Sequence, residues 1–157
     1  MRGWLILVAR IPASRLMTSS MAGRTEAYVD TAALIAFADG SDSHHALFRR
    51  LFAKPPPLVT TTLVVAEGHG WFLRRFDSAR ALQFLALVQS ILPLKVYCVG
   101  LGEQKAATLM LRRFSDQPLT LTDAVGLHLM TSRRVQSCWS TDRHMGLTGV
   151  PLVINLH

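Results

Sequence analysis

Cysteine is scarce in this chain of 157 residues, which contains only Cys98 and Cys138. Two cysteines so far apart can form neither the disulfide framework of a small secreted domain nor a CxxC zinc site. We therefore expect a reducing, cytoplasmic setting. Charged residues make up only 17% of the chain and hydrophobic residues 50%, a balance that excludes an intrinsically disordered protein. The length predicts a single domain.

Long hydrophobic runs and several catalytic motifs are also missing. No stretch of about 18 apolar residues is present, so no transmembrane helix is predicted. The absence of GxxxxGK[ST] and GxGxxG argues against a nucleotide phosphate loop, and the absence of HExxH and GxSxG argues against two common hydrolase classes. Asp30 follows a predicted strand but lacks the second Asp expected of a phosphoaspartate phosphatase.

The first 25 residues differ in composition from the rest. Their apolar stretch, Trp4–Ala9, is shorter than the roughly 7–15 residues of a secretory signal. We interpret residues 1–25 as a flexible extension or as a mis-assigned start, with Met17 and Met21 as alternative starts; an Arg-rich organelle transit peptide is a further reading. Residues 26–157 then form the folded domain.

Positive charge is in excess, but mostly because of that extension. Four of the 17 basic residues lie in the first 24 positions, which leaves 13 basic and 10 acidic residues and a net charge of +3. Such a mild excess is weak evidence for nucleic-acid binding. Arginines also occur in pairs, which suit the last turn of a helix: Arg49/Arg50, Arg74/Arg75, Arg112/Arg113 and Arg133/Arg134.

Strand-like and helix-like segments alternate from residue 26 onward. Strands are predicted at 27–29, 58–60, 94–99 and 135–140, with a fifth at 152–154. Helices are predicted at 31–38, 42–53, 62–76, 78–92, 101–114 and 120–131. This alternation predicts an α/β fold with a parallel sheet covered by helices on both faces. Functional sites of such folds lie at the carboxyl ends of the strands.

Two of the predicted helices have unusual patterns. The helix at 62–76 contains Gly68 and Gly70, each of which weakens a helix by about 1 kcal/mol relative to Ala. That cost suggests close packing or a nearby ligand. Its core candidates are Leu63, Val64, Ala66 and Trp71. The helix at 78–92 is apolar on most sides, as expected for a buried helix or one at a partner interface.

Four of the ten acidic residues fall at positions where they would meet. Asp30 directly follows the first strand and Asp142 the fourth, while Asp123 lies in the first turn of its helix. Glu67 sits in an apolar run, which predicts that its face of the helix points inward. In a parallel sheet these four carboxylates would gather at one end.

Each of these acids also has a purely structural interpretation. Asp30 would cap the following helix, Asp123 would form a capping box with Thr120, Asp142 would order a turn, and Glu67 would be an ordinary exposed residue. A cluster of four carboxylates, by contrast, is costly without a cation, because like charges oppose one another's ionisation. Oxygen donors without Cys or His favour Mg²⁺ or Mn²⁺ over zinc.

Four segments in order resemble a PIN domain, and more narrowly the VapC-type toxin ribonucleases of type II toxin–antitoxin systems. The segments are YVDTAALIAFADGSDSHHALF, VTTTLVVAEGHGWFLRR, DQPLTLTDAVGLHLM and WSTDRHMGLTG. The resemblance covers about residues 26–155. It implies a three-layer α/β/α fold with a central parallel sheet of four to five strands. The long N-terminal extension and the two glycines after Glu67 depart from the family pattern.

The resemblance also implies a catalytic site. Asp30 and Asp123 would be the main direct ligands of one or two Mg²⁺ or Mn²⁺ ions, while Glu67 and Asp142 would hold metal or its waters, one of them acting as base. The implied reaction is metal-assisted phosphodiester hydrolysis of RNA, in which activated water attacks phosphorus.

Further residues receive supporting roles from the same resemblance. Asp116 and Thr141 would lie just behind the metal ligands. Arg143, Arg74 and Arg75 would contact the RNA backbone. The implied partners are the RNA substrate and a cognate antitoxin that covers the active-site groove, while the apolar helix at 78–92 suggests a homodimer. No membrane association is expected.

Three other functions stay open at the level of sequence. The chain would be a PIN-fold nuclease outside a toxin pair, serving RNA processing or cutting a DNA flap; a binding protein that has lost catalysis; or a phosphatase of another α/β family. The intact set of four acids argues against the second, and the small size without an added nucleic-acid domain favours a toxin over the first. A neighbouring gene for a small DNA-binding protein would separate these readings.

Overall fold

A central parallel sheet of four strands organises the computed structural model, which describes residues 25–156. The strands are β1 (Ala27–Val29), β2 (Leu58–Thr61), β3 (Leu94–Tyr97) and β4 (Ser137–Trp139), in the spatial order β3-β2-β1-β4. Every pair of neighbours is parallel. The two central strands, β1 and β2, are completely buried, as parallel strands covered on both faces must be.

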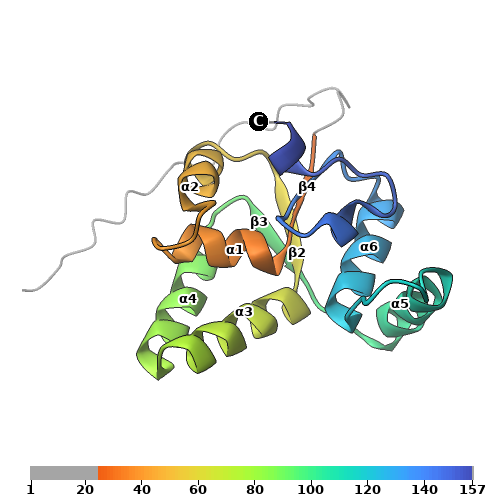
Figure 1. Ribbon diagram of the computed structural model, residues 1–157, viewed down its shortest axis with the longest axis horizontal. Helices are drawn as coiled ribbons and strands as arrows, with labels where there is room; N and C mark the ends of the chain where they lie inside the picture. The colour runs from red at the N-terminus through yellow and green to blue at the C-terminus, as the bar shows by residue number, and fades with distance from the viewer. Residues whose placement is uncertain (1–24, 157) are drawn as a thin grey trace, which may run out of the picture.

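Six α-helices flank this sheet on both sides (Figure 1). In Figure 1 α1 to α4 lie on one side of the strands, and α5 and α6 lie on the other. The helices are α1 (Thr31–Ala38), α2 (His45–Ala53), α3 (Thr62–Arg75), α4 (Ser78–Ser90), α5 (Leu101–Arg113) and α6 (Leu121–Arg133). Two 3₁₀ turns follow, η1 (Arg143–Gly146) and η2 (Val153–Asn155). The expected three-layer α/β/α architecture is confirmed.

The predicted fifth strand at 152–154 is wrong. Leu152 forms only a single parallel bridge with Cys138, and the chain then turns into η2. Leu152 and Val153 are nevertheless buried in the core, so their apolar character serves packing rather than a strand. The third and fourth strands are also shorter than predicted, ending at Tyr97 and spanning only Ser137–Trp139.

Two predicted helices begin or end differently. The second starts at His45 rather than at residue 42, because the Asp42 carboxylate accepts a hydrogen bond from the backbone N–H of His44 and holds a turn there. The fourth ends at Ser90, two residues earlier than predicted, because a residue that precedes proline disfavours helical geometry. Only one face of that helix is buried: Leu82 is 63% exposed.

Gly68 sits where α3 crosses α4. A β-carbon at this position would lie 2.7 Å from the Phe84 Cε1 atom of α4, closer than real side chains approach. The prediction of close packing is therefore confirmed for Gly68. Of the predicted core residues of α3, Val64 is buried, Leu63 and Trp71 are partly buried, and Ala66 is exposed.

Helix ends account for most of the arginine pairs. Arg50, Arg74, Arg75, Arg112, Arg113 and Arg133 all lie in the last turns of their helices. Within residues 25–156, no helix is both long and apolar enough to cross a membrane. The interpretation of residues 1–25 as an extension concerns a segment that lies almost wholly outside the described residues.

Candidate active site

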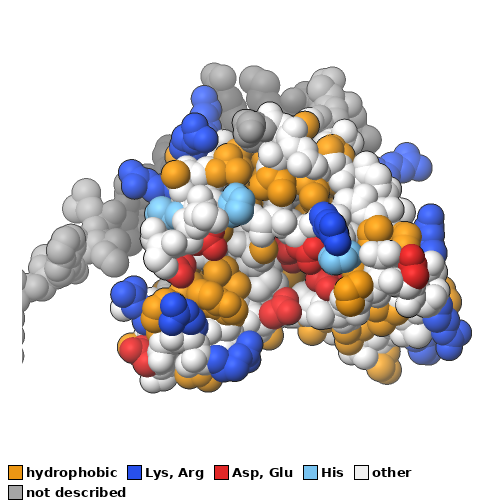
Figure 2. Space-filling view, viewed as in Figure 1, with side chains coloured by type: hydrophobic (Ala, Val, Ile, Leu, Met, Phe, Trp, Pro, Cys, Tyr) orange, Lys and Arg blue, Asp and Glu red, His pale blue; other side chains and the backbone are white. Residues whose placement is uncertain are grey.

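The four acidic residues singled out in the sequence line one cavity of about 420 Å³. Asp30 follows β1, Asp142 follows β4, Asp123 lies in the first turn of α6, and Glu67 lies in the middle of α3. Figure 2 shows acidic side chains gathered near the centre of this face, with one Lys or Arg side chain and a His beside them and further basic side chains toward the margins. The expectation that the four carboxylates come together at the ends of the strands agrees with this geometry.

Strand register brings Asp30 next to Ser140. Val29 of β1 pairs with Trp139 of β4 in the parallel register, so the residues that follow them leave the sheet side by side. The Ser140 hydroxyl donates a hydrogen bond of 2.7 Å to Oδ2 of Asp30. The same hydroxyl accepts a hydrogen bond of 2.9 Å from the backbone N–H of Asp142. Ser140 therefore connects two of the four acids.

Burial makes Asp30 the least ordinary acid of the site, since only 5% of the residue is exposed. Desolvation raises the pKa of its carboxyl group to about 6, and the charges of Asp123 and Glu67 add to the rise. Hydrogen bonds from Ser140 and from the Thr31 backbone oppose it. A carboxylate held in this way is poorly stabilised as an anion and would gain from a nearby cation.

The raised pKa of Asp30 predicts a stability change for Asp30→Asn in the presence of a chelator. Because the folded state binds this proton more tightly than the unfolded state, stability falls as pH rises through about 6. A rise from 3.8 to about 6 corresponds to about 3 kcal/mol as an upper limit. We expect Asn, which carries no charge, to raise the melting temperature at about pH 7.5 by several degrees.

The control for this prediction is the same pair of proteins at about pH 4.5, where wild-type Asp30 is mostly protonated and the difference should shrink. Thermal unfolding followed by circular dichroism measures both conditions. A variant that is less stable than wild type by the same amount at both pH values would show that the charge of Asp30 costs the fold nothing.

Glu67 is exposed at the cavity rather than turned into the core, so the expectation of an inward-facing side chain is wrong. Its Oε2 atom accepts a hydrogen bond of 2.6 Å from the hydroxyl of Thr31, the first residue of α1. This hydrogen bond links α1 to α3 and holds Glu67 beside Asp30, the residue that precedes Thr31.

Asp123 and Asp142 have the structural roles that the sequence suggested, and they line the cavity as well. Asp123 forms a capping box with Thr120: Oδ2 accepts from the Thr120 N–H at 2.8 Å, and the Thr120 hydroxyl accepts from the Asp123 N–H. Oδ1 of Asp142 accepts from the backbone N–H of His144 at 2.9 Å and contacts its Nδ1 at 2.7 Å. Asp30, in contrast, occupies a cap position without a side-chain capping bond.

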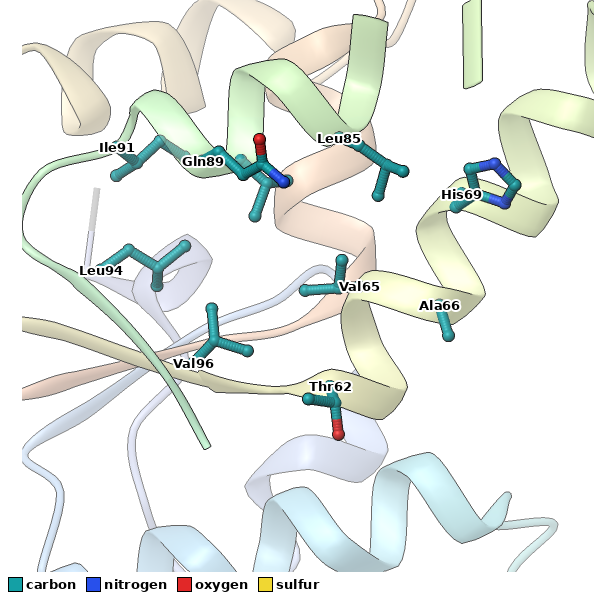
Figure 3. A pocket seen from close by; sticks show the side chains of 10 residues that line it. Thr62, Val65, Ala66, His69, Leu85, Gln89, Ile91, Leu94 and Val96 are labelled. Carbon is teal, nitrogen blue, oxygen red and sulfur yellow. The ribbon is translucent and has the colours of Figure 1, made fainter. Parts of the chain in front are cut away.

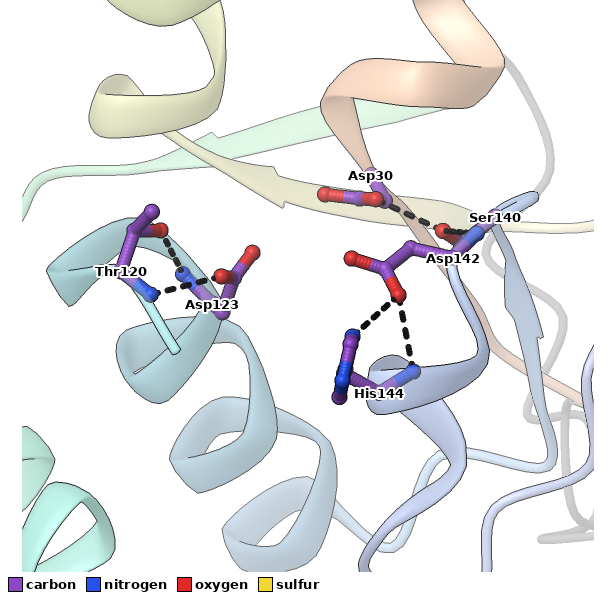
Figure 4. Close-up of polar contacts among 6 residues, drawn as sticks. All are labelled: Asp30, Thr120, Asp123, Ser140, Asp142 and His144. Carbon is purple, nitrogen blue, oxygen red and sulfur yellow. Dashed lines mark hydrogen bonds and ion pairs between the residues drawn. The ribbon is translucent and has the colours of Figure 1, made fainter. Parts of the chain in front are cut away.

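These bonds leave one carboxylate oxygen of each residue turned to the cavity. Within residues 25–156, no hydrogen bond reaches Oε1 of Glu67, Oδ1 of Asp123 or Oδ2 of Asp142. In Figure 4 Asp30, Asp123 and Asp142 direct their carboxylates toward the same space. The donor set is oxygen only, which suits a hard divalent cation. In the described part of the chain, however, no three acid, His or Cys side chains lie close enough to hold an ion together.

The remaining site residues named from the sequence divide into two groups. Arg74 lines the cavity, whereas Arg75, Arg143, Asp116 and Thr141 are not among its lining residues. Asp116 is exposed and accepts a hydrogen bond from the side chain of the adjacent Gln117.

Sequence reasoning missed three contributors to the cavity. Thr31 and Ser140 each donate a hydrogen bond to a carboxylate. The sequence signal was that Thr31 directly follows Asp30 and that Ser140 ends the fourth predicted strand. Trp71, a core candidate from its apolar character, packs partly buried against the core and also lines the cavity.

A second cavity of about 480 Å³ lies between α3, α4 and β3 (Figure 3). Its walls are mostly aliphatic, and His69 is the only titratable side chain among the described residues that line it. Without carboxylates or a cluster of polar groups, this cavity offers no hydrolytic chemistry. The chemistry of the described chain is therefore concentrated in the acidic cavity.

No protein-family model matches the chain. A sequence relative is the 23S rRNA-specific endonuclease VapC20 of Mycobacterium tuberculosis, which is 26% identical over 123 residues. The matched region covers 78% of this chain and 93% of that protein.

Solved structures with the same fold include that toxin. The crystal structure of M. tuberculosis VapC20, described as a sarcin–ricin loop cleaving toxin, has a TM-score of 0.72 at 24% identity and covers 79% of this chain and 95% of its own. PAE2754 from Pyrobaculum aerophilum has a TM-score of 0.60 at 22% identity, with coverages of 86% and 94%. A toxin–antitoxin complex from Klebsiella pneumoniae has a TM-score of 0.56 at 16% identity, with coverages of 81% and 95%.

Sequence and fold thus agree. The resemblance to PIN-domain VapC toxins is confirmed by a relative that the chain matches over most of its length. The PIN-like α/β/α fold is confirmed by the sheet topology and by the structural neighbours.

Proposed function

We propose that this protein is a Mg²⁺- or Mn²⁺-dependent endoribonuclease and the toxin of a VapBC-type toxin–antitoxin pair. The observation that carries the proposal is that Asp30, Glu67, Asp123 and Asp142, from four separate segments, line one cavity at the carboxyl ends of β1 and β4. The similarity to a 23S rRNA-specific endonuclease supports RNA as the substrate. The fold shared with a toxin–antitoxin complex supports an antitoxin partner.

In this proposal Asp30 and Asp123 would be the main ligands of the ion, and Glu67 and Asp142 would hold the ion or its waters, one of them serving as base. A divalent ion bound there would neutralise charge on the phosphate and promote ionisation of water. The buried Asp30 fits this role well, because a cation offsets the desolvation that raises its pKa.

Neighbouring side chains hold the acids in place for this chemistry. Ser140 positions Asp30 and the backbone at Asp142, and Thr31 positions Glu67. The 3₁₀ turn η1 and His144 fix one oxygen of Asp142. Each acid is thereby held through one oxygen while the cavity side stays open to substrate. Mutation of residues that hydrogen-bond to metal ligands commonly lowers metal affinity or activity by about 10–100-fold.

RNA and an antitoxin are the partners that this proposal implies. The chain would act on RNA in the cytoplasm and be silenced by an antitoxin that covers the cavity. A homodimer stays a prediction, which light scattering of the purified protein would decide. Exposed apolar side chains on α4 and β3, such as Leu82 and Val96, are compatible with a second copy packing there.

A cleavage assay on mixed tRNA and rRNA tests the proposal. Purified protein is incubated with Mg²⁺, with Mn²⁺ or with a chelator, and the products are separated on sequencing gels. We expect discrete cuts in accessible loops that require the metal, because unpaired nucleotides are the segments that proteins can reach in folded RNA. Mapping of the cut sites then identifies the RNA target.

Other outcomes would select among the alternatives. Metal-dependent cutting without a neighbouring antitoxin gene would favour a nuclease outside a toxin pair. Turnover of a phosphomonoester without RNA cleavage would favour a phosphatase. Failure to cut any RNA at any metal concentration, in protein that is folded and binds Mn²⁺, would contradict the proposed nuclease.

A further inference from the structure

One face of α3 extends the acidic cavity beyond the four carboxylates. Glu67, Trp71 and Arg74 all line that cavity. Their spacing of four and then three residues places them on one side of the helix. Gly70 lies on the same side and contributes no side chain. The α3 strip (Glu67, Gly70, Trp71 and Arg74) thus runs from an acid of the site to a cation within two helical turns.

The guanidinium group of Arg74 lies close to Gly70. A β-carbon at Gly70 would lie 3.0 Å from Nη1 of Arg74, so the guanidinium group folds back along the helix over the bare glycine. Arg74 has no ion pair within residues 25–156, and the described salt bridges of the chain involve other residues. A cation beside a cavity of four carboxylates that pairs with none of them is available to an anionic ligand.

Trp71 presents an aromatic surface to the same cavity. Its neighbours Phe72 and Phe76 meet the indole at interplanar angles of 77° and 68°, edge to face rather than stacked. Among the described residues, no Lys or Arg lies over the indole ring, whereas Phe76 has both Arg75 and Arg80 within cation–π distance. Trp71 therefore has neither a stacked aromatic ring nor a cation against its faces in this part of the chain.

We propose that the α3 strip is the binding subsite for an unpaired nucleotide next to the scissile phosphate, with its base stacked on Trp71 and its phosphate held by Arg74. This inference rests on the proposed function. An aromatic ring and an Arg side by side are the elements with which proteins bind single-stranded RNA, since every base has a face that stacks. A paired base in a duplex would not expose that face.

The geometry also favours RNA over an acidic protein segment at this subsite. A peptide carboxylate could pair with Arg74, but it gains little from a flat aromatic ring beside it. A nucleotide uses both features at once, one negative charge and one planar ring. The strip adjoins the carboxylates that would carry the cleavage, so a nucleotide bound there lies directly beside the reacting phosphate.

Binding measurements test the subsite separately from catalysis. The protein carries Asp30→Asn in all samples to prevent cleavage, and Mg²⁺ is present. The probes are a fluorescently labelled RNA hairpin with an unpaired loop of mixed sequence and a fully paired duplex of the same strand. Fluorescence anisotropy gives Kd for each probe over a range of salt concentrations.

We expect Trp71→Ala to weaken hairpin binding about tenfold or more, with little effect on the duplex, and Trp71→Phe to retain affinity within about threefold. Arg74→Ala should weaken hairpin binding and reduce the slope of log Kd against log salt by about 0.7. The matched controls are Leu73→Ala on the same helix and Arg112→Ala in the last turn of α5, both outside the cavity, which should change hairpin binding less than about twofold.

Gly70→Ala separates a binding role from a structural one. Alanine in place of glycine favours the helix by about 1 kcal/mol, so the variant should melt at a higher temperature. The new methyl group would crowd Nη1 of Arg74, the far end of a flexible side chain, so hairpin affinity should nevertheless fall slightly, by up to about threefold.

Several results would overturn the subsite. Equal losses for Arg74→Ala and Arg112→Ala would mean that only general positive charge matters. Normal hairpin binding in both Trp71→Ala and Arg74→Ala, with cognate antitoxin binding lost instead, would assign the strip to a protein partner. If wild type cleaves RNA and Trp71→Ala and Arg74→Ala, each made without Asp30→Asn, cleave equally well, the subsite alone is wrong. If wild type cleaves no RNA, the proposed function fails and the subsite with it.

Discussion

Asp30→Asn abolishes RNA cleavage while leaving the protein folded: this is the result we expect if the acidic cavity is the active site. The substitution removes the charge of the most buried acid but keeps its shape and an acceptor for the Ser140 hydroxyl. Mutation of residues that hydrogen-bond to metal ligands lowers activity by about 10–100-fold, so loss of a direct ligand should lower the rate of cleavage at least about a hundredfold. Asp123→Asn should have a similar effect.

The matched control is Asp77→Asn. Asp77 caps α4 by accepting a hydrogen bond from the backbone N–H of Arg80 and does not line the acidic cavity. Asparagine caps helices equally well, so this variant should cleave RNA like wild type. Product formation from the RNA pool and a thermal melt are measured for each protein. Wild-type activity in a clean preparation of Asp30→Asn would remove Asp30 from the site.

Gly68→Ala is expected to destabilise the protein by about 2 kcal/mol, because its new methyl group overpacks the crossing of α3 and α4. The group would lie 2.7 Å from Cε1 of Phe84, a side chain that is 2% exposed. Phe84 cannot move aside easily, because Phe72 stacks on its ring at 5.1 Å between centroids. The better helix propensity of alanine, worth about 1 kcal/mol, offsets only part of this cost.

Urea unfolding followed by circular dichroism measures the effect, and Gly102→Ala is its control. Gly102 lies in α5, where a β-carbon would meet nothing within 4 Å. The same chemical change should therefore leave the free energy of unfolding unchanged or raise it by up to about 1 kcal/mol. Equal effects at the two glycines would mean that helix propensity, rather than packing against Phe84, decides the outcome.

Most of the fold could be predicted from local patterns. The helix at Thr31–Ala38 and the strand at Ala27–Val29 were predicted with the bounds that they have. The fifth strand could not be, because Leu152 and Val153 have the composition of a strand but are buried for packing. Periodicity reports burial, and burial alone does not tell a strand from a 3₁₀ turn.

The candidate site was predicted in its acids but less well in the side chains that support them. Asp123 and Asp142 each serve a cap or turn and line the cavity too, so the structural and functional interpretations were not exclusive. Ser140 and Thr31 were missed because a hydroxyl has no sequence signature that distinguishes a hydrogen bond to a carboxylate from exposure to water. Trp71 does pack against the core, where a large aromatic residue at helical spacing usually lies, but its second role at the cavity was missed.

The sequence by itself determined the alternation of strands and helices, and with it the end of the sheet at which a site must lie. It also placed Asp30 and Asp142 at that end, because a residue directly after a buried parallel strand leaves the sheet there. Tertiary structure alone decided which partners hold each acid. The pairing of β1 with β4 brings Ser140 to Asp30 across 110 residues, and the approach of α1 to α3 brings Thr31 to Glu67. Such long-range neighbours depend on strand register and helix packing, which no local sequence pattern encodes.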